Sequence, residues 1–265
     1  MPVPPPGKLL LAAAVLLGAA LAQAAQPSDH PATVAAPPLR TVAAHGPLAV
    51  QLPTAEPGGK KAGVKKPPMP RTDQRTGVTP PRPWSLPGGK VLYLTFDDGP
   101  QPVYTPKVLA VLAKHHAQAT FFVLGREAAA HPALVETTRR AGHRIGNHTW
   151  DHPMLTKLSP ARLRQEISTG VRSKCFRPPF RDTNAHVAAV ASSYGQHQVL
   201  WDVDTRDWEK PGVARIERAL IRGARPGAIF LMHDGGGNRS QTVAALDQAL
   251  TKLAEQGYAF RSLPC

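Results

Sequence analysis

Short apolar runs alternate with amphipathic segments along the chain from Gly89 to the C-terminus. The runs are rich in β-branched and aromatic residues, which favours buried strands. Two amphipathic segments begin with a capping residue and a proline, at Thr105 and Ser159, which favours helices. The pattern predicts strands at residues 91–94, 119–124, 143–147, 174–177, 198–203, 228–232 and 258–262, and helices from 105 and at 132–140, 159–171, 185–194, 213–221 and 242–256.

Repeated strand–helix units predict an α/β fold, here a distorted (β/α) barrel of about seven parallel strands. Residues 89–265 are long enough for a single domain with a sizeable core. In such barrels the functional groups collect at the carboxyl ends of the strands. The polar residues that follow each predicted strand are therefore the candidates for a site.

The first 88 residues have a different pattern. Residues 1–24 combine a weakly positive start, a short apolar core and a small-x-small ending, which predicts a cleaved signal peptide, with an uncleaved N-terminal anchor as the alternative. Residues 25–88 hold 14 of the 29 prolines and show no apolar periodicity, which predicts a basic, disordered linker. We therefore expect an exported protein, periplasmic or secreted, with no membrane span after signal removal.

The formal net charge of +14 is spread over the linker and the domain. A charge of this size raises the question of a nucleic-acid partner. We predict none, because the chain has no basic stripe with interleaved aromatic residues. An exported basic chain meets anionic envelope polymers and lipid head groups first.

Two adjacent carboxylates, Asp97 and Asp98, stand at the end of the first predicted strand. Neighbouring side chains on a strand point to opposite sides, so one can hold a metal while the other serves as a base. An Asx-type turn that caps the strand is the alternative.

His148 and His152 follow the third predicted strand, four residues apart. In a helical turn this spacing places both imidazoles on one face, as metal pairs require. With Asp98 they would form a site with open positions, which suits a divalent metal, zinc or a similar ion such as cobalt. From the spacing alone, two surface histidines remain the alternative.

Three further strand ends carry polar or aromatic clusters. Arg177 precedes two prolines, and its guanidinium could hold a carboxylate, with Asp97 as the best candidate. Trp201 and Trp208 flank an acidic stretch and are either core residues or a wall for a sugar ring. His233, followed by a carboxylate, is a candidate general acid near neutral pH.

Together these motifs resemble the polysaccharide deacetylases of carbohydrate esterase family 4, across residues 90–264. The five family motifs occur in order: TFDDG at 95–99, H-[ST]-x-x-H at 148–152, an R-x-P-P-type motif at 177–180, D-x-x-D-W at 204–208 and L-x-H at 231–233. Two features depart from the family pattern. Arg181 stands where the family usually has glycine, and the segment between His152 and Arg177 is shorter than usual.

The resemblance implies a role for each matched residue. Asp97 would be the general base, Arg177 its orienting partner, and Asp98, His148 and His152 the metal ligands. The backbone N–H of Phe180 would donate to the oxyanion, His233 would be the general acid tuned by Asp207, and Trp208 would form part of the groove wall.

These expectations describe a metal-dependent N-deacetylase that acts on N-acetylglucosamine units of peptidoglycan or a similar envelope or extracellular polysaccharide. An O-acetyl esterase of the xylan type, or another amidohydrolase on the same fold, is one alternative. An inactive carbohydrate-binding domain is another, although such a module needs neither Asp97 nor His233. A polysaccharide is the expected partner, and a monomer the expected oligomeric state.

The chain has two cysteines, Cys175 and Cys265. An exported chain meets an oxidising compartment, where an even number of cysteines usually pairs. The C-terminus would have to turn back to reach the start of the strand that follows Cys175. The sequence therefore leaves open both a disulfide and a buried Cys175 with a frayed terminus.

Overall fold

The computed structural model describes residues 89–265. The predicted signal peptide at 1–24 and the predicted linker at 25–88 lie outside the described residues. Among the helices of residues 89–265, none has the length and apolar character that a membrane span requires.

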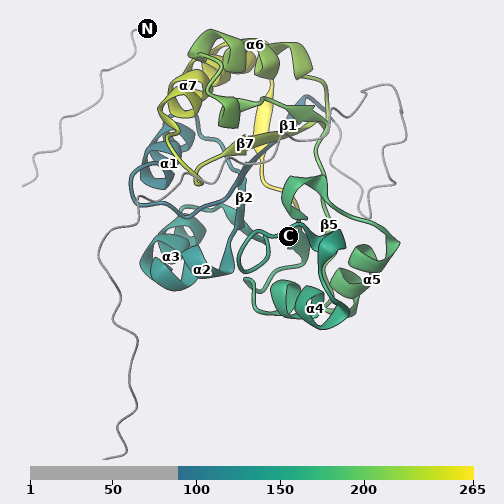
Figure 1. The fold of residues 1–265 in the computed structure, drawn as a ribbon. Coiled ribbons are helices and arrows are strands. Elements are labelled where there is room, and N and C mark those ends of the chain that lie inside the picture. Colours follow the sequence, from purple (N-terminus) through teal and green to yellow (C-terminus); the bar gives the residue numbers. More distant parts are fainter. Residues whose placement is uncertain (1–88) are drawn as a thin grey trace, which may run out of the picture. The chain divides into compact units, whose positions relative to one another are not determined.

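Parallel strands form the sheet at the centre of the fold (Figure 1). Seven strands follow the order β5-β4-β3-β2-β1-β7-β6, and β8 pairs with β1 beside this path. In residues 89–265 the strands are β1 (Val91–Asp97), β2 (Thr120–Val123), β3 (Arg144–Asn147), β4 (Cys175–Phe176), β5 (His197–Gln198), β6 (Val203–Asp204), β7 (Ile229–His233) and β8 (Ala259–Arg261).

Helices connect the strands and cover the sheet. They are α1 (Thr105–Lys114), α2 (Gly125–Ala130), α3 (Pro132–Arg140), α4 (Pro160–Ser168), α5 (Ala185–Ser193), α6 (Val213–Gly223) and α7 (Ser240–Glu255), with short 3-10 turns η1 (Leu155–Lys157), η2 (Pro179–Arg181) and η3 (Asp207–Glu209). Figure 1 shows α6 beside α7 at one end of the domain and α4 beside α5 at the other.

The sheet forms an incomplete barrel because its two edge strands follow each other directly along the chain. β5 and β6 lie on opposite edges, and residues 199–202 are all that connects them. So short a connection holds the two edges near each other. The prediction of a distorted barrel of parallel strands is confirmed. The single strand predicted at 198–203 is wrong, because its residues are divided between the two edges.

β1 carries side chains into both the core under the helices and the barrel interior. Leu94 and Phe96 belong to the larger apolar core, which includes residues of α1, α6 and α7. Tyr93 belongs instead to a second cluster in the barrel. Because side chains alternate along a strand, Thr95 and Asp97 share the side of Tyr93. The strand thus brings the Asp97 carboxylate to the carboxyl end of the barrel interior.

Cys175 and Cys265 form a disulfide bond, with their Cα atoms 5.1 Å apart. The last residues turn back toward β4, and the buried Leu263 anchors them, since its backbone N–H donates to Thr120 Oγ1 at 2.9 Å. This pairing answers the question that the sequence leaves open.

Replacing both cysteines by serine is expected to lower the free energy of unfolding by about 2–4 kcal/mol, because the bond joins residues 90 positions apart and restricts the unfolded chain. Denaturant titration of the oxidised wild-type protein and the double variant measures the difference. Activity should persist below the unfolding transition, since neither cysteine lies in a motif. Two free thiols in denatured, non-reduced wild-type protein would contradict the bond.

Candidate active site

Arg177 holds the carboxylate of Asp97 inside the barrel. Its Nη1 donates to Asp97 Oδ1 at 2.8 Å and to Thr95 Oγ1 at 2.7 Å, and its Nε donates to the carbonyl oxygen of Val199 at 3.2 Å. The Arg177 side chain is fully buried, and its Cζ lies 4.0 Å from the centre of the Phe122 ring. The ion pair expected between Arg177 and Asp97 is therefore present, with the guanidinium fixed on several sides.

Asp98 turns away from the strand that carries Asp97. Its φ of 72° lies in the left-handed region. Its Oδ1 lies 3.1 Å from His152 Nε2 and 3.5 Å from His148 Nε2. Burial raises the pKa of Asp98, but the two imidazoles outweigh burial and hold the pKa well below its ordinary value. The carboxylate is thus ionised, as a metal ligand has to be.

The turn from His148 to His152 is irregular, which corrects the helical turn expected from the spacing. Thr149 and His152 have positive φ angles of 70° and 63°. Thr149 Oγ1 accepts the backbone N–H of His152 at 3.0 Å. Glu166 of α4, which is fully buried, accepts the two backbone N–H groups that follow Thr149, at 3.2 and 3.0 Å. Sequence reasoning missed Glu166, because its partners are backbone groups that no motif marks.

Asp98, His148 and His152 fit a divalent metal ion. His148 Nδ1 donates to the carbonyl oxygen of Arg177 at 2.7 Å, which leaves its Nε2 lone pair toward Asp98. One ligand atom from each of the three residues lies within 4.8 Å of the others. Two imidazole nitrogens and one carboxylate oxygen form a donor set typical of catalytic zinc.

His233 at the end of β7 is paired with Asp207 of η3. His233 Nδ1 donates to Asp207 Oδ1 at 2.7 Å, while the His233 backbone N–H and Thr242 Oγ1 donate to Asp207 Oδ2 at 2.9 and 2.8 Å. Burial lowers the pKa of His233, but the Asp207 carboxylate outweighs burial and raises the pKa above its ordinary value. For Asp207 the two effects have opposite signs. Burial raises the pKa of its carboxyl, but the nearby His233 outweighs burial and brings the Asp207 pKa below its ordinary value. The pair therefore favours a protonated His233.

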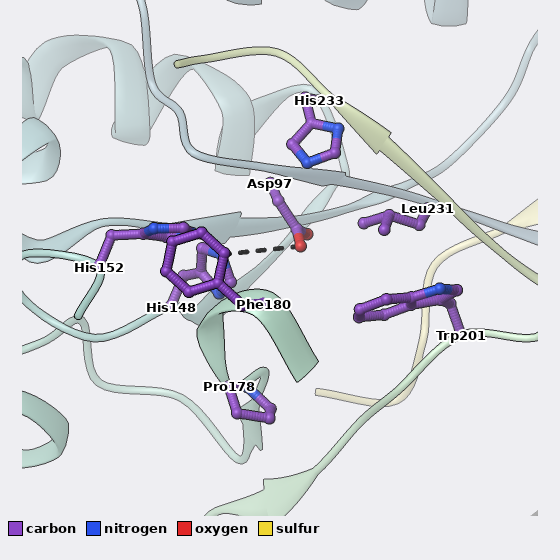
Figure 2. Close-up of a pocket in the computed structure, with 8 residues that line it drawn as sticks. All are labelled: Asp97, His148, His152, Pro178, Phe180, Trp201, Leu231 and His233. Atoms are coloured by element: carbon purple, nitrogen blue, oxygen red, sulfur yellow. Dashed lines mark ion pairs between the residues drawn. The ribbon is translucent and has the colours of Figure 1, made fainter. Parts of the chain in front are cut away.

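A pocket opens at the carboxyl end of the barrel, and Figure 2 shows Asp97 within it between His233 and His148. Its lining consists of Asp97, His148, His152, Pro178, Phe180, Trp201, Leu231 and His233. The candidate base, the candidate acid and two candidate metal ligands therefore face one space. Arg177, Asp98 and Asp207 are buried and contact these residues without lining the pocket.

Trp201 forms a wall of this pocket, and the structure does not bring Trp208 into its lining. The Trp208 ring instead lies 5.9 Å from the guanidinium carbon of Arg206. Phe180 lines the pocket as expected, with a φ of 57° and its ring edge-on to His152 at a centroid distance of 4.4 Å. The sequence pattern could not separate the two indoles, because both flank the same acidic stretch.

The chain is similar in sequence to known deacetylases. A family model described as polysaccharide deacetylase matches residues 86–199. The chain is 42% identical over 188 residues to a peptidoglycan-N-acetylglucosamine deacetylase of Bacillus cereus, a match that covers 67% of this chain and 88% of that protein. It is 39% identical over 198 residues to a chitooligosaccharide deacetylase of a Bradyrhizobium species, with 67% and 90% covered.

A solved structure has the same fold. A family 4 carbohydrate esterase from Streptomyces lividans, in complex with acetate, matches with a TM-score of 0.61 and 36% sequence identity. The match covers 64% of this chain and 91% of that chain.

Proposed function

Because the chain belongs to the polysaccharide deacetylase family, carbohydrate esterase family 4, we propose that it removes acetyl groups from N-acetylglucosamine units of peptidoglycan or a similar polysaccharide. It is a hydrolase of linear amide C–N bonds, like the relatives it matches. The observation that carries the proposal is the pocket of Figure 2, where Asp97, His233 and two imidazoles of the Asp98–His148–His152 set face one space.

Each side chain has one task in the proposed reaction. Asp97, oriented by Arg177, takes a proton from the attacking water, whose oxygen adds to the acetamide carbon. The backbone N–H of Phe180 donates to the oxyanion that forms. His233 gives its proton to the departing nitrogen, so the C–N bond breaks and acetate and a free amine are released.

Asp98, His148 and His152 are the proposed ligands of a divalent metal ion, which we propose is zinc. When bound there, the ion supplies Lewis acidity toward the acetamide carbonyl. Arg177 connects these ligands to the base, because its backbone carbonyl orients His148 and its guanidinium orients Asp97. One residue therefore sets the relative position of the two groups.

The pairing of His233 with Asp207 favours an amide over an O-acetyl ester as the substrate. An amine is a poor leaving group until it is protonated, so amide cleavage depends on a well-placed acid. The raised pKa of His233 keeps the required proton on the imidazole.

We infer that the protein acts outside the cytoplasm on a polysaccharide partner. The pattern of residues 1–24, with its apolar core and small-x-small ending, supports export. Peptidoglycan, the substrate of the Bacillus cereus deacetylase that this chain resembles, is a polymer of the cell envelope.

Acetate release from three substrates tests the proposal. Zinc-loaded protein is incubated with peptidoglycan, chitooligosaccharides and acetylated xylan, beside a sample treated with a chelator. We expect acetate and new free amines from at least one of the first two substrates, and none after chelation. Acetate from xylan alone would assign the protein as an O-acetyl esterase instead of an N-deacetylase. Acetate from none of the three substrates would contradict both activities.

Replacing Asp207 by asparagine is expected to shift the alkaline limb of the kcat/KM profile to lower pH. His233 acts in its protonated form, so activity falls as the pH rises through its pKa. Burial lowers this pKa and the Asp207 carboxylate raises it, so without the carboxylate the effect of burial prevails. Profiles of the zinc-loaded wild-type protein and the variant measure the shift.

Thr242→Val is the matched control for this prediction. It removes one hydrogen bond to Asp207 but keeps the carboxylate. Its alkaline limb should therefore stay close to that of the wild-type protein. An unchanged limb in Asp207→Asn would contradict the role of His233 as the acid.

A further inference from the structure

Arg181 lies along the edge of the pocket. Its backbone follows Phe180, which lines one wall, and its guanidinium carbon lies 5.7 Å from the ring centre of Trp201, which lines another. The exposed side chain therefore reaches from one wall to the other. The guanidinium thus places a positive charge next to Trp201, at a wall of the pocket.

The positive charge of Arg181 is available to a ligand. Within residues 89–265 its guanidinium forms no hydrogen bond or ion pair, and the contact it makes is with the Trp201 ring. The acidic side chains that adjoin Arg181 and Trp201 in the sequence, Asp182 and Asp202, are engaged elsewhere. Both carboxylate oxygens of Asp182 accept hydrogen bonds from Thr156. Asp202 accepts the backbone N–H of Ile229 and lies 3.6 Å from the guanidinium of Arg225.

The backbone gives no structural reason for an arginine at this position. Arg181 has a φ of 59°, in the left-handed region that glycine adopts freely and arginine does not. Its side chain is exposed, so it fills no core. What the arginine adds to the molecule is a charged fork beside Trp201, a wall of the pocket.

We propose that Arg181 binds a carboxylate of the substrate and selects glycans in which the reacting N-acetylglucosamine neighbours an acidic sugar. A guanidinium matches a carboxylate with two parallel hydrogen bonds, and an indole under the guanidinium holds its plane in place. The lactyl carboxylate of muramic acid, in glycan strands freed of peptide, has this chemistry. Chitooligosaccharides are neutral and lack it. The inference rests on the proposed deacetylase function.

The test compares one glycan in two charge states. The anionic substrate is peptide-free peptidoglycan strands, and the neutral one is the same strands with their lactyl carboxylates converted to methylamides. The ratio of kcat/KM, anionic over neutral, is measured for the wild-type protein and for Arg181→Gln. We expect the substitution to lower this ratio about tenfold, the factor of a modest hydrogen bond to a charged group. In the wild-type protein the ratio should also fall with added salt.

Arg206→Gln is the matched control. Arg206 is likewise exposed, has a φ of 53° and lies 5.9 Å from an indole. It differs from Arg181 because its guanidinium pairs with Glu209 and because its indole, Trp208, does not line the pocket. In Arg206→Gln the ratio of kcat/KM, anionic over neutral strands, should stay at the wild-type value. An equal fall in both variants would overturn the inference, because it would indicate general surface charge. Arg181→Gly, which relieves the backbone, should behave like Arg181→Gln.

Binding separates failure of this inference from failure of the proposed function. Calorimetry measures the affinity of the protein for both strand preparations without any turnover. Tighter binding of the anionic strands, lost in Arg181→Gln, would support the inference even for a protein that releases no acetate. Equal affinity and equal kcat/KM for the two preparations would overturn it, while acetate release from both would leave the deacetylase function standing.

Discussion

Protein with alanine at His148 is expected to contain no stoichiometric zinc and to release acetate at least about a thousandfold more slowly than the wild-type protein, a factor worth ~4 kcal/mol of transition-state stabilisation. Alanine at Asp98 or His152 should have the same effect. Three ligand atoms converge within 4.8 Å, and a site that loses one keeps too few protein ligands to retain a catalytic ion. Metal analysis and an acetate assay on the same purified samples measure the two losses.

His186→Ala is the control for this result, since His186 is an exposed histidine outside the pocket. Its zinc content and its rate should equal those of the wild-type protein. Circular dichroism of each variant shows whether the fold persists. Full zinc occupancy in His148→Ala would remove His148 from the ligand set.

Asparagine at Asp97 should separate metal binding from turnover. The amide keeps the size of the carboxylate but cannot accept the proton of the attacking water, so kcat should fall by about a thousandfold. Substrate affinity should change little, because the residue acts in the transition state. Asp97 is not among the three converging ligands, so zinc should remain bound. Steady-state kinetics and metal analysis of one preparation give both readouts.

A variant that retains most of its turnover would exclude Asp97 as the base. A variant that loses its zinc would show instead that Asp97 takes part in metal binding, which its 3.7 Å distance from His148 Nε2 makes worth testing.

The sequence predicted the barrel because its central strands, β1, β2 and β7, are short apolar runs. The same feature located the site, since residues after Asp97, Asn147 and Leu231 reach the same end of parallel strands. What the pattern could not predict is which edge a short apolar run joins. Residues 198–203 read as one strand, yet their backbone hydrogen bonds go to β4 on one side and β7 on the other.

Other features were hidden because they depend on backbone groups far away in the chain. The irregular turn at His148 is held by Glu166 through main-chain N–H groups, and no spacing rule encodes such a contact. The choice between Trp201 and Trp208 depends on where the chain bends after β5. The Cys175–Cys265 bond depends on the return path of the last residues, which Leu263 fixes through Thr120.

The connection between β5 and β6 helps to orient the proposed catalytic base, Asp97, through Arg177. Arg177 donates to the carbonyl oxygens of Val199 and Leu200 in this connection, at 3.2 and 3.5 Å, while it holds Asp97. The guanidinium therefore has its full set of partners only when residues 199 and 200 run between the two edge strands. The proposed metal ligands follow β1 and β3, whereas this anchor of the base and β7, the strand of the acid, come later in the chain. The groups proposed for metal binding and those proposed for proton transfer therefore depend on different parts of the fold.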